Sequence, residues 1–67
     1  MQLTINGKAR SFDLVQMNVA QLVEQLALIG KRLAIELNGE IVPRSQFEAT
    51  KLSDGDKLEI VGAVGGG

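Results

Sequence analysis

Three glycines at the end of the chain have the type and spacing to support chemistry. Gly65, Gly66 and Gly67 directly follow a segment with the alternation of a strand. Glycine has no Cβ, so it can enter a cleft too narrow for other residues and adopt the backbone angles that a partner imposes. From residue 62 to residue 67, an extended chain reaches roughly 20 Å at about 3.4 Å per residue. We therefore expect residues 65–67 to form a flexible tail, although a frayed end or a linker remnant is an alternative.

The group that such a tail would present is a terminal carboxylate. This group is anionic at neutral pH and does not react with nucleophiles. Joining it to AMP would give a mixed anhydride with a good leaving group. A sulfur donor could then replace AMP and leave a thiocarboxylate, whose sulfur is nucleophilic at physiological pH. In this hypothesis Gly67 is the modified residue, and other proteins carry out each catalytic step.

The side chains offer no competing catalytic group. The 67 residues include no histidine and no cysteine, which excludes the usual general base near neutral pH, disulfides and thiolate metal sites. Asp54 and Asp56 are similar to a fragment of a calcium loop, but the other ligands of that loop are missing and a turn explains the pair. We predict no metal site, and we expect that the chain by itself is not an enzyme.

Charge and hydropathy argue against two classes of partner. The chain contains seven Lys and Arg and eight Asp and Glu, and aromatic residues make up 3% of it. Nucleic-acid binders, in contrast, show an excess of basic residues or aromatic residues that stack on bases. No apolar run approaches the roughly 20 residues that span a bilayer, and no signal peptide precedes the first strand. We expect a cytoplasmic protein that binds neither nucleic acid nor membranes.

Alternating apolar and polar residues predict five strands. The expected strands are residues 1–6, 10–14, 33–37, 40–42 and 57–61. Asn-Gly pairs at 6–7 and 38–39 favour tight hairpin turns. Pro43 has no amide hydrogen, so it should end the fourth strand and place it at a sheet edge. In the last strand, Leu58 and Ile60 should face the core and Val61 should face out.

One amphipathic helix is predicted over residues 19–29. Its apolar stripe has the spacing i, i+3, i+4 and i+7 and consists of Val19, Leu22, Val23 and Leu26. Asn18 is a favourable N-cap, and Gln21 three residues later can complete a capping box. Gly30 is placed to end the helix in the left-handed conformation.

These elements predict an α+β fold of one domain, because 67 residues allow no more. A helix that crosses one face of a mixed sheet of four to five strands buries the apolar faces economically. This is the β-grasp, or ubiquitin-like, arrangement, in which the last strand lies centrally. We expect the domain to cover residues 1–64, with Phe47 and Leu52 of the irregular segment 44–53 packed under the core.

Three segments together resemble the ThiS family of sulfur carriers in thiamine biosynthesis. They are residues 33–47, residues 52–61 and the final Val-Gly-Gly-Gly at 64–67. The most specific motif is Asn-Gly-Glu-Ile-Val-Pro-Arg at 38–44. Phe47 stands where the family often has another aromatic residue. The resemblance covers essentially the whole chain.

The resemblance implies a sequence of partners. A ThiF-like adenylyltransferase would use ATP and magnesium to adenylate Gly67, and a cysteine-derived persulfide would supply sulfur. A ThiG-like thiazole synthase would then accept that sulfur, and this chain would itself hold no cofactor. Gly65 and Gly66 would be recognised as part of the tail. We expect the free protein to be a monomer.

Three further residues are candidates for docking these partners. They are Arg44, Val61 and Ala63, and the alternative is that they are ordinary surface residues.

Three alternative functions stay open at this point. The small subunit of molybdopterin synthase has the same fold, tail and thiocarboxylate chemistry, although that family tends to be longer and lacks the Val-Pro-Arg pattern. A sulfur carrier for methionine or for a secondary metabolite would have the same features. A ubiquitin-like binding module that undergoes no chemistry would not need a free glycine terminus.

Overall fold

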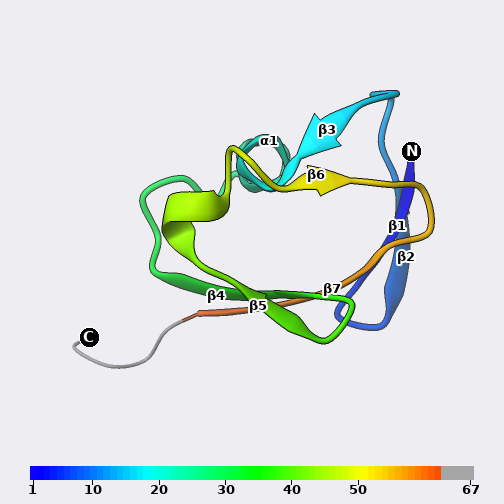
Figure 1. The fold of residues 1–67 in the computed structure, drawn as a ribbon. Helices are drawn as coiled ribbons and strands as arrows, with labels where there is room; N and C mark the ends of the chain where they lie inside the picture. The colour runs from blue at the N-terminus through cyan, green and yellow to red at the C-terminus, as the bar shows by residue number, and fades with distance from the viewer. Residues whose placement is uncertain (63–67) are drawn as a thin grey trace.

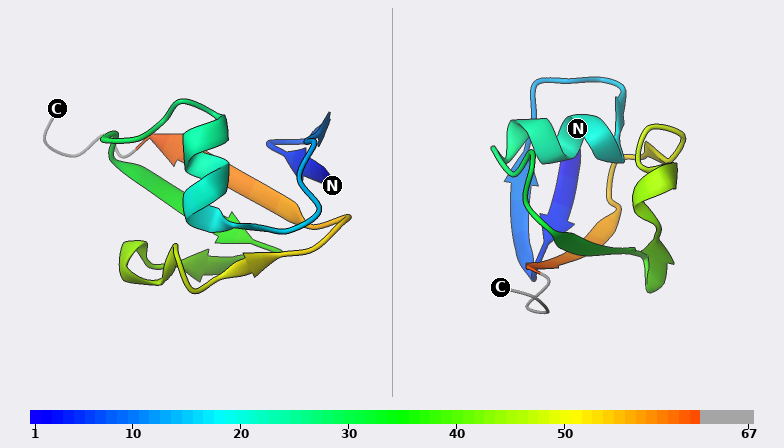
Figure 2. Two further views of the ribbon diagram at one scale, coloured as in Figure 1. Left: turned by 90° about the horizontal axis from the view of Figure 1, so that it is seen from above. Right: turned by 90° about the vertical axis from the view of Figure 1, so that its left-hand side faces the viewer.

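The computed structural model describes residues 1–62, which form a mixed five-stranded sheet crossed by one helix (Figure 1). In sheet order the strands are β2 (Lys8–Ser11), β1 (Gln2–Ile5), β7 (Lys57–Gly62), β4 (Leu33–Leu37) and β5 (Glu40–Val42). The helix α1 (Val19–Gln25) lies over one face of this sheet (Figure 2). The α+β class and the β-grasp arrangement expected from the sequence are confirmed.

The last strand, β7, occupies the middle of the sheet. It runs parallel to β1, where Ile5 pairs with Leu58, and antiparallel to β4, where Ile35 pairs with Ile60. Leu58 and Ile60 are buried in the core, whereas Glu59 between them and Val61 after them are exposed. The central place and the facing predicted for this strand are therefore confirmed, and β5 lies at an edge as Pro43 indicated.

The first hairpin differs from the prediction in its second strand. Asn6 and Gly7 both have positive φ, 52° and 81°, as a two-residue type I′ turn requires. This tight turn pairs Ile5 with Lys8, so β2 begins at Lys8 and the predicted start at residue 10 is wrong. Phe12 and Leu14, at the end of the expected strand, follow β2 instead and pack half-buried against the core.

The helix begins as predicted. The Gln21 amide donates to Asn18 Oδ1 at 2.8 Å, and the Asn18 amide donates to Gln21 Oε1 at 2.9 Å. This reciprocal capping box satisfies two backbone donors that the first turn of a helix otherwise leaves unpaired.

The helix ends earlier than predicted, at Gln25 rather than at residue 29. Ala27 adopts the left-handed conformation, with φ 58°, that was expected of Gly30. The Ala27 amide donates to the Glu24 carbonyl at 3.0 Å, and the Leu28 amide donates to the Val23 carbonyl at 3.0 Å. This is a Schellman motif with alanine at the position that usually holds glycine. Gly30, with φ 84°, serves the turn that follows.

A second, two-stranded sheet was not predicted. It pairs β3 (Met17–Asn18) with β6 (Lys51–Leu52), which places the helix start beside the irregular segment. That segment also contains a single 3₁₀ turn, η1 (Arg44–Gln46). Phe47 and Leu52 are buried beneath it, as expected.

The core lies between α1 and the inner face of the sheet. Its largest fully buried side chains are Leu3, Val19, Leu22, Ile35 and Leu58. No helix within residues 1–62 is long and apolar enough to cross a membrane.

Truncating the centre of this core should strongly destabilise the fold. Leu22 and Ile35 are both 0% exposed, so Leu22→Ala or Ile35→Ala should lower the free energy of unfolding by about 2–5 kcal/mol. Denaturant unfolding measures this loss. Val15→Ala is the control, because Val15 is 93% exposed and its truncation should cost little. Equal effects at the three positions would contradict the assigned core.

Replacing Ala27, which adopts the left-handed conformation, with glycine should stabilise the fold. Ala27→Gly relieves the contact between Cβ and the backbone at φ 58°, which outweighs the greater freedom of glycine in the unfolded chain. We expect the free energy of unfolding to rise by about 0.5–1 kcal/mol in thermal or denaturant melts. Ala20→Gly, within α1, should be destabilising in the same assay.

Candidate functional site

Four of the residues singled out from the sequence lie outside the described residues: Ala63, Gly65, Gly66 and Gly67. Gly62, the last residue of β7, is the described residue nearest to them in the chain. The candidate site is therefore the end of β7 together with the groups that fix and surround it.

Asn6 extends the pairing of β7 after the β1 backbone has turned away. The Asn6 amide donates to the Leu58 carbonyl at 2.9 Å, as in an ordinary parallel ladder. The Ile60 amide then donates to Asn6 Oδ1 at 2.7 Å, and Asn6 Nδ2 donates to the Ile60 carbonyl at 3.0 Å. The Asn6 side chain thus takes the place of a further residue of β1 and fixes β7 two residues before Gly62.

Asn38, in the turn between β4 and β5, fixes the start of the same strand. The Lys57 amide donates to Asn38 Oδ1 at 3.0 Å, and the Asn38 amide donates to the Lys57 carbonyl at 2.8 Å. Asn38 Nδ2 also donates to Asp56 Oδ1 at 3.1 Å. Because each hairpin turn supplies an asparagine to β7, this strand is bonded by side chains near both of its ends.

Arg44, a candidate docking residue, bonds to the loop that precedes β4. Its Nη2 atom donates to the Lys31 carbonyl at 2.9 Å, in the loop that leads to Leu33, and Leu33 pairs with Gly62. Arg44 also lines an open groove of about 330 Å³ that Ile29, Leu33 and Phe47 border. Arg44 therefore has a bond within the fold and remains exposed at this groove.

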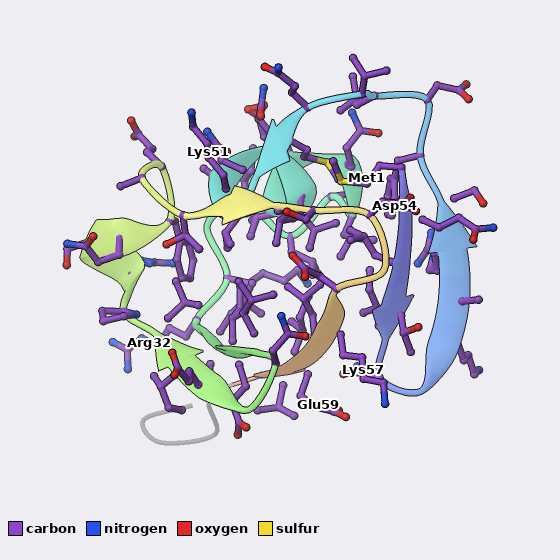
Figure 3. The ribbon with its side chains drawn as sticks, turned by 45° about the vertical axis from the view of Figure 1, so that its right-hand side comes forward. Met1, Arg32, Lys51, Asp54, Lys57 and Glu59 are labelled. Carbon is purple, nitrogen blue, oxygen red and sulfur yellow. The ribbon has the colours of Figure 1, made fainter. Side chains whose placement is uncertain are left out.

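Val61, the second candidate, lies on the outer face of the sheet, which is the face away from α1. It is 57% exposed and pairs with Ala34, whose side chain is also exposed. Figure 3 shows Glu59 of the same strand pointing away from the helix. Val61 is thus available to a partner at the strand that continues toward residue 67.

Sequence reasoning missed Ile41, a second large apolar side chain on the outer face. Ile41 is 66% exposed in β5 and pairs with Glu36 of β4. The buried Val42 next to it implies that Ile41 points out, because successive strand residues face opposite sides. The motif at 38–44 contained this signal, but three residues are too short for alternation to reveal it.

Two kinds of site are absent from the described residues. They contain no group of three or more His, Cys, Asp or Glu side chains placed to hold a metal ion. They also bury no polar or charged residue that could be tuned as an acid or base. The geometry provides a strand that is bonded on both edges and an exposed apolar face that includes Val61 and Ala34.

Comparisons with known proteins give the family of the chain. The sequence model of the ThiS family matches residues 3–67. The sulfur carrier protein ThiS of Bacillus subtilis is 32% identical over 65 residues, which cover 97% of this chain and 98% of that protein. The crystal structure of a thiamine biosynthesis protein, ThiS, from Geobacter metallireducens superposes with a TM-score of 0.87 and 39% identity, covering 100% of both chains.

A much longer protein also matches. A thiazole synthase of Paramagnetospirillum magneticum is 45% identical over all 67 residues. These residues make up 20% of the synthase, so the chain spans about a fifth of that relative's length.

Removing the Asn6 side chain should loosen β7. Asn6→Gly keeps the positive φ of 52° accessible and deletes both bonds to Ile60, so we expect a loss of about 1–2 kcal/mol in the free energy of unfolding. Hydrogen exchange at the Ile60 amide should become about tenfold faster or more. Asn6→Asp, which keeps the acceptor Oδ1, should show a smaller effect. An unchanged Ile60 exchange rate in Asn6→Gly would show that the side chain does not fix the strand.

Proposed function

The chain belongs to the ThiS family, and from this membership we propose that it carries sulfur for thiazole formation in thiamine biosynthesis. The observation that supports this most directly is the match of the family over residues 3–67, which includes the three terminal glycines. The likeness over full length to ThiS of Bacillus subtilis, a sulfur carrier by name, supports the same proposal.

The proposed reaction takes place at the carboxylate of Gly67. A carboxylate oxygen attacks the α-phosphorus of ATP, and pyrophosphate leaves, so Gly67 becomes an acyl adenylate. The terminal sulfur of a cysteine persulfide then attacks the acyl carbon and AMP leaves. A second thiol cleaves the resulting sulfur–sulfur bond, which leaves a thiocarboxylate on Gly67 and a disulfide in the donor. The magnesium ion belongs with ATP in the activating enzyme.

Two enzymes are proposed as partners. A ThiF-like adenylyltransferase would form the acyl adenylate, and a ThiG-like thiazole synthase would take the sulfur. The thiazole synthase of Paramagnetospirillum magneticum supports the second partner, because one chain there contains a segment 45% identical to this protein. The chain itself would act as a protein substrate rather than as an enzyme.

The fold contributes to this reaction by fixing the position of β7. The ladders of β1 and β4 and the Asn6 side chain fix β7, so the chain leaves the sheet at a defined place, Gly62. Gly65 and Gly66 are proposed to enter the narrow clefts of both enzymes, because they lack side chains. Arg44, Val61 and Ala63 remain proposed docking residues, and Ile41 joins them on the outer face.

Intact mass spectrometry tests the proposal directly. The protein is incubated with ATP, magnesium, the cognate adenylyltransferase and a cysteine persulfide donor. We expect one oxygen to be replaced by sulfur at Gly67, and an unchanged mass would contradict sulfur carriage. The native mass also checks that Gly67 carries the α-carboxylate. A second assay measures where the sulfur goes. Transfer of the sulfur to a thiazole synthase, rather than to a molybdopterin precursor, distinguishes the proposed function from that of the small subunit of molybdopterin synthase.

Deleting Gly67 should abolish function without affecting the fold. The buried core consists of residues between Leu3 and Ile60, so we expect the melting temperature to be unchanged, while complementation of a thiamine auxotroph should be lost. Adding one residue after Gly67 should likewise prevent ATP–pyrophosphate exchange, because the carboxylate is displaced from its register. Complementation by the shortened chain would rule out Gly67 as the modified residue.

A further inference from the structure

The outer face of the sheet carries two acidic side chains directly opposite each other. Glu36 of β4 pairs with Glu59 of β7, and both are exposed. Each alternates with a buried isoleucine, Ile35 or Ile60, so both carboxylates must project from the same face. Figure 3 shows Glu59 on this face, with Lys57 nearby.

Such a pair disfavours the isolated fold. Like charges directly opposite each other in an antiparallel ladder repel and destabilise the sheet. In the part of the chain that the structure describes, no hydrogen bond or ion pair joins either carboxylate to another side chain. Lys57 lies on the same face, two residues from Glu59, and reduces the repulsion without bridging the pair. A cation from another molecule would relieve the repulsion fully.

Apolar side chains also border the pair. On the same face, Val61 and Ala34 form the next pair toward the end of β7, and Ile41 lies across from Glu36 on β5. Val61 and Ile41 are 57% and 66% exposed, so both side chains are accessible to another molecule. A negative centre with aliphatic groups on two sides fits one long basic side chain, whose methylene stem can lie on the apolar groups.

We propose that this outer face, formed by Ala34, Glu36, Ile41, Glu59 and Val61, docks on the thiazole synthase through a Lys or Arg placed between the two carboxylates. The identity of the partner rests on the proposed function. Charge complementarity selects the basic side chain, and the exposed valine and isoleucine require aliphatic neighbours around it. The face includes β7 itself, so docking there would place the last described strand against the synthase.

Charge reversal tests the proposed contact. The dissociation constant between the whole protein and the cognate thiazole synthase is measured for Glu36→Lys and Glu59→Lys. Each should weaken binding at least tenfold, because a cation would then face a cation. Glu48→Lys changes the net charge equally, in the loop between η1 and β6, and should leave the dissociation constant within about twofold. Binding of the wild type should weaken as salt rises.

Neutral variants separate docking from a structural role. Glu36→Gln and Glu59→Gln remove the repulsion, so the melting temperature should rise by about 1–4 °C. The same variants should bind the synthase about two- to fivefold more weakly. A side chain that served only the fold would instead lower the melting temperature when changed and leave binding unaltered.

Three outcomes decide the proposal. Weaker binding with an equal or higher melting temperature supports it. Unchanged binding in both lysine variants overturns it, as does an equal loss in Glu48→Lys. The proposed function is judged separately by mass: if the wild type forms the Gly67 thiocarboxylate while both lysine variants still bind the synthase normally, sulfur carriage stands and this docking face is wrong.

Discussion

Pairing of β7 on both of its edges is the constraint on which the rest of the molecule depends. β1 lies along one edge in parallel and β4 along the other in antiparallel orientation. The last strand in the sequence is therefore among the most firmly held, although chain ends are usually the least ordered parts of a domain. A strand at the sheet edge would fray from its last residue inward. A central strand such as β7 is held in position by hydrogen bonds on both of its edges.

Two asparagines extend this constraint beyond the strands. Asn6 and Asn38 occupy hairpin turns because they tolerate positive φ, and their side chains then bond the backbone of β7. Each residue thus acts twice, once in shaping its own hairpin and once in fixing a distant strand. The turns and the central strand therefore support one another, which helps a chain of 67 residues without cysteine to fix one strand on both edges.

The sequence predicted what depends on local chemistry and missed what depends on distant partners. The capping box of Asn18 and Gln21 and the turn at residues 6–7 were predictable, since neighbours in the chain determine them. The helix end was not, because Ala27 adopts a left-handed conformation that propensity assigns to glycine. The pairing of β3 with β6 could not be predicted, because each strand has only two residues and shows no alternation of apolar and polar side chains. For the candidate site, the alternation predicted exposure of Val61, but the bond between Asn6 and Ile60, 54 residues apart, could not be foreseen.

The N-terminus has a consequence for handling the protein. The Met1 ammonium donates to the carbonyls of Phe12 at 2.8 Å and Leu14 at 3.2 Å. A peptide bond in front of Met1 would leave a single hydrogen on that nitrogen, so one of the two carbonyls would lose its donor. Affinity tags or fluorophores attached there would disturb the segment that leads into β3. The exposed loop around Val15 is a less disruptive site for a label, because the Val15 side chain contributes almost nothing to the core.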